Sequence, residues 1–248
     1  MQYPLRPLVI IPTYNERANI TQLIPAILCA DDRLHVLIVD DSSPDNTGSA
    51  VLDLKEKEYP DRIFLHTRPG KLGLGSAYVC GFKWGLERGY DFLFQMDGDW
   101  SHNPADLKRM LQAGENHDFV IASRYIEGGG TLNWGLGRKS LSQFASVYSR
   151  IILGSDFADF TGGFNGWSGK LLQAIDVDSL RSDGYSFQIE LKHLADKLGF
   201  RHIEIPITFT ERRAGKSKMS LAIAVEAGWR VWKFRFDWNK SSRHRLKE

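Results

Sequence analysis

The first half of the chain alternates short apolar runs with amphipathic stretches. Runs that are apolar along nearly their whole length are typical of strands covered on both faces, and such strands are predicted at residues 8–11, 35–39, 62–69, 91–97 and 118–125. The stretches between them have helical periodicity and predict helices at residues 16–30, 50–59, 75–89 and 104–114. This alternation predicts an α/β fold, a mainly parallel sheet with helices on both faces.

The pattern changes in the second half of the chain. The elements predicted there are a glycine-rich loop at 127–140, an amphipathic helix at 141–154, a loop and helix at 178–199, and a strand with a basic loop at 200–218. No linker composition and no internal repeat separates these parts. One domain over residues 1–219 with a C-terminal appendage over residues 220–248 is therefore the simplest division.

The appendage begins with the pattern of an amphipathic helix over residues 220–238. At about 100° per residue, one apolar stripe consists of Leu221, Val225, Trp229, Trp232 and Phe236, widened by Ala227, Val231, Phe234 and Trp238. A narrow polar face and a basic tail accompany it, which is typical of a helix lying in a membrane interface. A core helix packed on the sheet and a dimer interface are the alternatives. No stretch reaches the roughly 18 unbroken apolar residues of a membrane span.

Composition narrows the classes of function. Of the 248 residues 42% are hydrophobic and 25% charged, as in ordinary globular proteins, and the net charge of +2 gives no indication of a nucleic-acid partner. Cys29 and Cys80 lack metal-ligand spacing, so we predict reduced core thiols in a cytosolic chain. The N-terminal apolar run ends at Pro12 and is too short for a signal peptide.

Polar residues are concentrated where the predicted strands end, which is where open α/β sheets bind ligands. They are Thr13, Tyr14, Asn15, Glu16, Asp40, Asp41, Asp97, Asp99, Ser123 and Arg124. In extended backbone Asp97 and Asp99 point the same way, and two converging carboxylates suit Mg²⁺ or Mn²⁺ that also holds phosphates. A solvated turn is the alternative for an isolated D-x-D. A calcium loop is excluded, because His102 and Lys108 occupy the places of the required Gly and Glu.

Several motifs, in order along residues 8–218, resemble one family. They are PTYNERANI, IVDDSSPDNTG, KLGLGSAYVCGF, QMDGDWSHNP, ASRYIEGG, DFTGGFNGW, GYSFQIEL and PITFTERRAGKSKM. Together they resemble the polyprenol (dolichol)-phosphate mannosyltransferases of glycosyltransferase family 2. The resemblance implies the GT-A fold, a nucleotide-diphosphate sugar donor such as GDP-mannose, Mg²⁺ or Mn²⁺ as cofactor, and inversion at the anomeric carbon.

The resemblance also assigns residues to the donor. Around the nucleoside it places Pro12, Tyr14, Glu16, Val39 and Asp41; for the metal and diphosphate it implies Asp97, Gly98 and Asp99; as phosphate-binding cations it implies Arg124, Arg212 and Lys218. Many relatives carry Ala where this chain has Gly98, and we expect the glycine to let backbone approach the ligand more closely. Ser101 stands where some relatives have a Gln ligand, and we expect it to lie outside the metal's coordination shell.

For the acceptor, a polyprenyl phosphate, the resemblance implies Arg124, Arg138 and Ser142, with Asp99 completing the catalytic set. Arginine forks match phosphate oxygens. Because such a phosphate is already anionic, the reaction needs alignment and no general base. The alternative for Arg138 is a surface cation on a loop. Relatives usually carry Arg where this chain has Asn165, which affects local packing or the charge on the acceptor side.

Other functions stay open at this point. The same fold could transfer glucose or an amino sugar to a lipid phosphate, a nucleotidyltransferase also uses paired carboxylates and a metal, and a catalytically inactive membrane-docking module needs no chemistry. The resemblance implies a peripheral enzyme on the cytoplasmic face of a membrane. Its partners would be the membrane surface and, as in some relatives, a membrane-anchoring protein.

Overall fold

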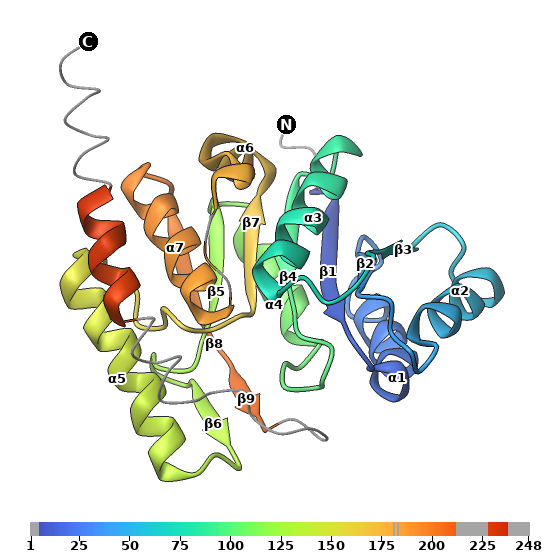
Figure 1. Ribbon diagram of the computed structural model, residues 1–248, viewed down its shortest axis with the longest axis horizontal. Coiled ribbons are helices and arrows are strands. Elements are labelled where there is room, and N and C mark those ends of the chain that lie inside the picture. The colour runs from blue at the N-terminus through green and yellow to red at the C-terminus, as the bar shows by residue number, and fades with distance from the viewer. Residues whose placement is uncertain (1–4, 181, 183, 212–227, 238–248) are drawn as a thin grey trace.

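A sheet of seven strands forms the centre of the computed structural model, which describes residues 5–180, 182, 184–211 and 228–237 (Figure 1). The strand order is β3 (Ile63–Thr67), β2 (His35–Asp40), β1 (Pro7–Thr13), β4 (Phe92–Gln95), β7 (Asn165–Ser168), β5 (Phe119–Ser123) and β8 (His202–Pro206). Among these strands the pairings are parallel, except that β7 runs antiparallel to β4 and β5. The predicted α/β fold with a mainly parallel sheet is confirmed.

Helices cover both faces of the sheet. One core contains residues of α1 (Arg17–Leu28), α2 (Thr47–Lys57) and α4 (Asp106–Gly114). The other contains residues of α3 (Leu74–Glu87), α5 (Leu136–Leu153), α6 (Gly169–Ile175), the short 3₁₀ helix Val177–Ser179 and α7 (Gly184–Lys197). A two-stranded parallel sheet, β6 (Gly130–Leu132) with β9 (Thr208–Thr210), lies beside α5 (Figure 1).

The alternation of side chains along β1 explains how one short strand serves both cores. Leu8 and Ile10 belong to the core under α3, whereas Val9 and Ile11 belong to the core under α1, and all four are fully buried. Successive side chains of a strand point to opposite faces. A strand in the middle of the sheet must therefore be apolar at every position, as the sequence of β1 is.

The second half differs in detail from the sequence-based prediction. The glycine-rich stretch contains strand β6, and α5 begins at Leu136, so Arg138 lies on a helix and the alternative of a loop cation is wrong. Strand β7 was not predicted, since Asn165 and Gly166 interrupt its apolar pattern. The cysteines are free but are not core residues, because Cys29 is exposed and Cys80 only half-buried.

The predicted C-terminal helix lies partly outside the described residues, as does the boundary at residue 219. Residues 228–237 are helical. Val231 in this segment is buried in the core under α3 and Phe234 packs against that core, so one side of the segment is a structural part of the domain. Within the described ranges, no helix has the length and apolarity needed to cross a membrane.

Close packing between α3 and the sheet generates a stability prediction at Gly85. A Cβ there would lie 2.6 Å from Leu93 Cδ2 and 2.9 Å from Leu8 Cδ2. Gly85→Ala should therefore lower the free energy of unfolding by about 1–3 kcal/mol through overpacking.

Urea unfolding measures the effect, with Gly137→Ala as the matched control. Gly137 lies in α5 with nothing within 4 Å of an added Cβ. Alanine there should be neutral or stabilise by up to about 1 kcal/mol. Equal free energies of unfolding for the two variants would contradict the packing argument.

Candidate active site

The candidate site lies at the edge of the sheet where the parallel strands β1, β2, β4 and β5 all end. Thr13 closes β1, and its hydroxyl donates to Asp40 Oδ1 at the end of β2 over 2.8 Å. Asp40 Oδ2 accepts from the Ser43 backbone N–H at 3.0 Å, which holds the following turn. These bonds fix the two strand ends beside each other. The predicted gathering of polar residues at this edge is confirmed.

The carboxylate pair follows directly after β4. At Gly98, between the two aspartates, an added Cβ would lie 3.3 Å from Ile11 Cγ2 and 3.3 Å from Ile20 Cδ1, in the core under α1. Position 98 therefore faces the core. The expected reason for the glycine is wrong, because the space that it leaves is on the protein side and not on the ligand side.

Each aspartate has its own partners. The Tyr78 hydroxyl donates to Asp97 Oδ1 at 3.4 Å, His102 Nε2 lies 3.5 Å from Asp97 Oδ2, and the Ser101 backbone N–H donates to Asp99 Oδ1 at 3.1 Å. Burial, and then the charges of Asp97 and Asp99, raise the pKa of Tyr78 well above its ordinary value. Tyr78 therefore stays a neutral donor beside the pair.

The donor set fits a divalent cation that is shared with a ligand. In the part of the chain that the structure describes, no three His, Cys, Asp or Glu side chains are grouped closely enough to hold a metal by themselves. Asp97 and Asp99 supply two hard oxygen donors, and Mg²⁺ and Mn²⁺ are commonly bound by one or two carboxylates together with substrate phosphates. Asp97 and Asp99 are thus the residues that would hold such an ion.

On the β1–β2 side, the residues predicted around the nucleoside lie on neighbouring strands and turns. Asp41 is buried, and both of its oxygens meet Arg68, with Nε–Oδ1 at 2.6 Å and Nη2–Oδ2 at 2.8 Å. Tyr14 is exposed, and Lys71 Nζ lies 4.8 Å from its ring centroid. Val39 is fully buried in the core, so only its backbone could meet a ligand.

Glu16 and Pro12 complete this side. Glu16 precedes α1, and its Oε2 accepts from the side chain of Asn19 at 2.7 Å. Pro12 lies in β1, paired in register with Val39. The structure places these residues together with Asp41 along one stretch of the edge.

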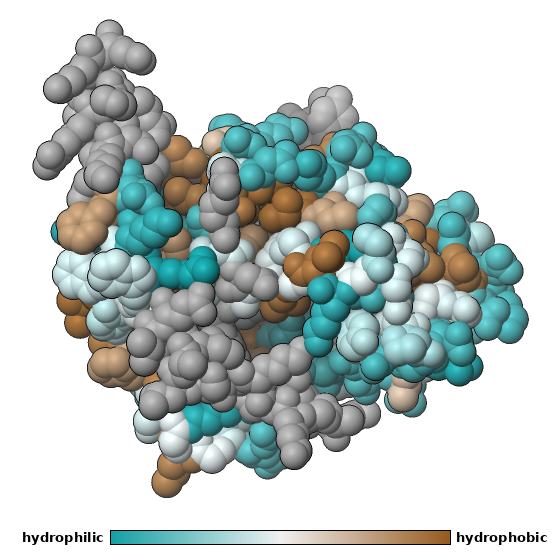
Figure 2. All heavy atoms as spheres, viewed as in Figure 1, coloured by the Kyte–Doolittle hydropathy of each residue, from teal (hydrophilic) through white to brown (hydrophobic). Residues whose placement is uncertain are grey.

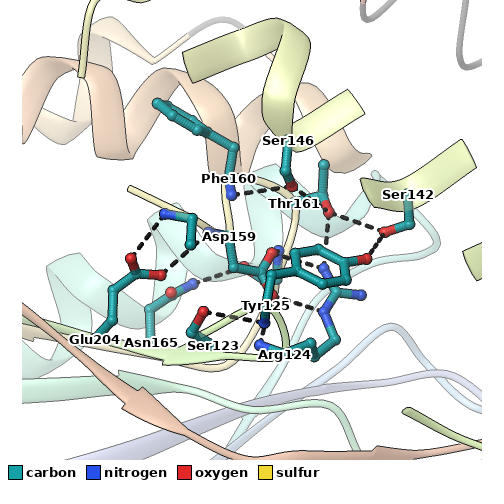
Figure 3. A network of polar contacts seen from close by, with 12 residues as sticks. Ser123, Arg124, Tyr125, Ser142, Ser146, Asp159, Phe160, Thr161, Asn165 and Glu204 are labelled. Atoms are coloured by element: carbon teal, nitrogen blue, oxygen red, sulfur yellow. Dashed lines mark hydrogen bonds and ion pairs between the residues drawn. The ribbon is translucent and has the colours of Figure 1, made fainter. Parts of the chain in front are cut away.

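At the end of β5, Arg124 forms a buried ion pair with Asp159 (Figure 3). Asp159 Oδ2 accepts from Arg124 Nε at 2.7 Å and from its backbone N–H at 3.1 Å, and Asp159 Oδ1 accepts from Arg124 Nη2 at 2.7 Å. The side chains are 5% and 0% exposed. The fork of Arg124 formed by Nε and Nη2 is therefore engaged by Asp159 in this structure, and the expected contact of Arg124 with a phosphate stays a prediction.

Residues of α7 and β8 hold the loop 159–163, which carries Asp159. Lys192 of α7 is fully buried and donates to the carbonyls of Asp159 at 2.8 Å and Gly162 at 3.0 Å. Glu204 of β8 accepts from the backbone N–H of Asp159 at 3.1 Å. The loop also approaches the carboxylate pair, since a Cβ at Gly163 would lie 3.9 Å from Asp97 Oδ2. The loop 159–163 thus binds Arg124 at one end of the site and lies close to Asp97 at the other.

The pKa values follow from this burial. Burial alone would raise the pKa of Asp159, but the charge and hydrogen bonds of Arg124, with Lys192, hold it at about 2. Burial lowers the pKa of Lys192 to about 8, against the opposing effect of the Asp159 and Glu204 charges. Arg124, Asp159 and Lys192 therefore all carry charge at neutral pH.

A second arginine approaches from the first turn of α5. The guanidinium of Arg138 lies 4.1 Å from the Trp134 ring centroid, and that of Arg124 lies 5.4 Å from the same ring. Arg138 Nη1 also donates to Glu211 at 3.2 Å. Ser142, one turn further along α5, accepts from the Tyr125 hydroxyl at 2.7 Å. The predicted acceptor residues Arg124, Arg138 and Ser142 are thus brought to one side of the site.

Three residues of the candidate site, Asp159, Trp134 and Lys192, are not predicted from the sequence. The motif DFTGGFNGW contains Asp159 but indicates no role for it, and the glycine-rich pattern around Trp134 predicts a loop. Lys192 lies on the inward face of α7 with the buried Gln188 and Ala195, a placement that only the structure shows. Arg212 and Lys218, predicted as phosphate ligands, lie outside the described residues.

Asn165 stands where relatives usually carry Arg. Its surroundings are the hydrogen-bond network of the loop 159–163 and Lys192. Asn165 is fully buried, and its Nδ2 donates to the Gly162 carbonyl at 3.0 Å and to Gln188 Oε1 at 3.1 Å. Lys192 Nζ donates to the same Gly162 carbonyl at 3.0 Å. At the Gly162 carbonyl the cation thus comes from α7, while strand β7 contributes a neutral amide.

The fold is that of a GT-A glycosyltransferase, and the sequence comparisons agree. Residues 8–175 match the family model described as Glycosyl transferase family 2. The chain belongs to this family and is a glycosyltransferase, as the motifs predicted. It is 45% identical to the polyprenol monophosphomannose synthase of Mycolicibacterium smegmatis, over 91% of this chain and 85% of that protein. It is 46% identical to the undecaprenyl-phosphate mannosyltransferase of Micrococcus luteus, over 90% of this chain and 91% of that protein.

Solved structures share the fold at low sequence identity. Glucosyl-3-phosphoglycerate synthase from Mycobacterium tuberculosis, in complex with phosphoglyceric acid, has a TM-score of 0.64 and 17% identity over 94% of this chain and 79% of that one. The mannosyltransferase PcManGT from Pyrobaculum calidifontis, in complex with GDP-Man and Mn²⁺, has a TM-score of 0.57 and 22% identity over 87% of this chain. The chain spans 59% of the length of that mannosyltransferase. These likenesses establish the fold.

The buried lysine generates a prediction on pH dependence. The pKa of Lys192 is about 8 in the folded chain, below its ordinary 10.5. Between these values the unfolded chain binds more protons, so this group makes the free energy of unfolding rise with pH across the window. Lys192→Met should lose that rise.

Urea unfolding of both proteins at several pH values between about 8 and 10.5 measures the difference. Exposed Lys170→Met on α6 is the matched control and should follow the wild type. Parallel pH profiles for Lys192→Met and wild type would contradict the assignment of a depressed pKa to Lys192.

Proposed function

We propose that the protein transfers mannose from GDP-mannose to a polyprenyl phosphate, with inversion at the anomeric carbon, giving polyprenyl-phosphate mannose and GDP. The proposal is supported by two relatives, 45% and 46% identical over nearly the whole chain, whose names describe mannosyl transfer involving polyprenyl or undecaprenyl phosphate. The observation that carries it is the convergence of Arg124 and Arg138 on Trp134, beside a loop that also reaches Asp97. One end of this site suits a diphosphate and the other suits a second phosphate.

On the donor side, Asp97 and Asp99 would hold Mg²⁺ or Mn²⁺ against the diphosphate. Such an ion, when bound, supplies positive charge where the departing diphosphate gains negative charge. Tyr14, Glu16 and Asp41 line the adjoining stretch of the edge and would orient the nucleoside. Arg212 and Lys218 remain predicted phosphate ligands.

On the acceptor side, Arg138 and Ser142 would hold the lipid phosphate in line with the anomeric carbon. A phosphate oxygen is already an anion at neutral pH, so no side chain has to remove a proton before it attacks. Arg124 adds its charge close by while Asp159 fixes its orientation. Alignment by rigid groups is therefore the main contribution of this half of the site.

The lipid acceptor implies work at a membrane surface, and we infer a peripheral protein on the cytoplasmic face. Residues 220–248 would form its membrane-interface helix and basic tail. A membrane-anchoring partner protein remains a prediction of the family resemblance.

The decisive assay offers the full-length protein several radiolabelled nucleotide sugars with Mg²⁺ or Mn²⁺ and a polyprenyl phosphate. Label from GDP-mannose should pass into the organic phase, and label from UDP-glucose or UDP-N-acetylglucosamine should not. Transfer only from another nucleotide sugar would overturn the choice of mannose. No transfer from any donor would overturn the proposed activity.

The carboxylate pair generates a prediction on turnover. Asp99→Asn should reduce transfer at least about 100-fold, because loss of one ligand charge weakens both the metal and the diphosphate contact. Turnover and thermal melting are measured together, with exposed Asp53→Asn on α2 as control. A folded Asp99→Asn enzyme with near wild-type turnover would remove the metal assignment.

Arg138 generates a prediction on acceptor binding. Charge-assisted hydrogen bonds contribute about 1.5–3 kcal/mol, which corresponds to about 10- to 100-fold in affinity. Arg138→Ala should raise the KM for a short-chain, water-soluble prenyl phosphate by that factor and leave the KM for GDP-mannose nearly unchanged. Exposed Lys139→Ala on the same helix is the control. Equal losses for donor and acceptor would place Arg138 on the wrong side of the site.

A further inference from the structure

His102 is buried beside the carboxylate pair. Its side chain is 1% exposed, and among the described residues neither of its ring nitrogens has a hydrogen-bond partner. A buried polar atom without a partner costs free energy, so each such atom in a folded protein calls for an explanation. An apolar ring could fill the same space without this cost. The presence of an imidazole here points to a use of its nitrogens.

One of these nitrogens lies next to Asp97. His102 Nε2 is 3.5 Å from Asp97 Oδ2, and the hydroxyl of the fully buried Tyr78 donates to Asp97 Oδ1 at 3.4 Å. Both distances are slightly longer than the usual range of about 2.7–3.2 Å for hydrogen bonds of N–H groups. A displacement of about 0.5 Å would bring either donor to an ordinary distance. Each oxygen of this carboxylate thus has a buried donor group beside it.

Aromatic side chains hold the imidazole in this place. Phe164, which directly precedes β7, and Phe209 of β9 pack against it, with ring centroids 4.8 Å and 5.1 Å from that of His102. Strand β9 is also joined to the same turn, because the Thr210 backbone N–H donates to the Ser101 carbonyl at 3.1 Å. The ring therefore has little freedom to move away from Asp97.

The backbone of the turn that leads to His102 has an unusual conformation. Trp100 has a φ of 64°, in the left-handed region that a bulky residue rarely adopts. The Ser101 backbone N–H donates to Asp99 Oδ1 at 3.1 Å within the same turn. Disfavoured backbone conformations persist where surrounding contacts hold them, and they are concentrated at functional sites. This turn brings the side chain of residue 102 back to that of residue 97.

We propose that His102 and Tyr78 are positioning residues, which hold the Asp97 carboxylate between them and orient it toward a divalent cation. The inference rests on the proposed function, because that function assigns Asp97 to the cation. A carboxylate oxygen has two lone pairs, so it can accept from a buried donor and still bind a metal ion. Donors behind a metal ligand fix its direction, and their removal commonly lowers metal affinity by about 10- to 100-fold.

Mn²⁺ binding tests the proposal without reference to turnover. The two quantities are the Kd of Mn²⁺ for the full-length protein with GDP, from the electron paramagnetic resonance signal of free Mn²⁺, and the Kd of GDP without metal. His102→Phe keeps a ring between Phe164 and Phe209 and removes both nitrogens. It should raise the Kd of Mn²⁺ about tenfold or more and leave the metal-free Kd of GDP unchanged.

Tyr78→Phe removes a single oxygen atom from the other side of Asp97. It should raise the Kd of Mn²⁺ at least about threefold, again without a change in metal-free GDP binding. Tyr90→Phe is the matched control, since Tyr90 is 3% exposed and its hydroxyl lies 2.6 Å from His35 Nδ1 at the opposite edge of the sheet. This control should bind Mn²⁺ like wild type.

His102→Gln separates positioning from packing. Its amide nitrogen can take the place of Nε2, so it should recover most of the affinity that His102→Phe loses, although it replaces the ring. Thermal melting shows whether each variant is folded. If His102→Phe is unfolded, Tyr78→Phe and His102→Gln decide the question.

A Kd of Mn²⁺ equal to that of wild type in folded His102→Phe and in Tyr78→Phe would overturn the positioning role. Equal losses in His102→Phe and His102→Gln would overturn it for His102, because the ring would then act through packing alone. Wild type that binds no Mn²⁺ with GDP would contradict the metal assignment and this role with it. Wild type that binds Mn²⁺ but transfers no mannose would contradict the proposed function alone, since the binding constants still decide the role.

Discussion

The buried ion pair between Arg124 and Asp159 is the constraint on which this end of the candidate site depends. Removing two charges from water costs several kcal/mol for each ion unless hydrogen bonds complete the environment. Here Thr161, Lys192 and Glu204 complete it, from the loop itself, from α7 and from β8. Elements that are far apart in sequence are therefore held at one point, and the guanidinium has one defined orientation.

The antiparallel strand β7 is what brings the aspartate to that point. A strand that runs against β4 and β5 begins at the edge where those strands end, with Asn165 paired to Gln95 on one side and Ile121 on the other. The loop 159–163 immediately before it consequently lies at the site. A parallel strand inserted at the same place would have carried its preceding loop to the opposite edge of the sheet.

Those parts of the fold that follow local rules could be predicted from sequence. The apolar runs of β1 and β2 specify buried strands, and the apolar run of β4 places Asp97 and Asp99 just beyond its end. Strand β7 could not be predicted, because Asn165 and Gly166 are neither apolar nor β-branched, and their places are determined by Gln188 and by the rings of Phe92 and Phe94. Lys192 was missed for the same reason, since only the tertiary structure gives a buried ammonium its carbonyl partners.

Helix α5 links the two physical problems that a lipid phosphate presents, because its headgroup must be held by polar groups while its chain must stay in an apolar phase. A single helix can satisfy both requirements, since its faces point in opposite directions at a fixed separation of about 10 Å. Ser142 and Arg138 lie toward the site, and Phe144 and Ile151 lie toward solvent. Arg138 in the first turn of the helix and Ser142 one turn later are carried by the same rigid element as this apolar face, part of which is visible along the edge that α5 forms in Figure 2. The helix therefore fixes where the polar groups stand relative to the apolar face, which a flexible loop in the same place would not do.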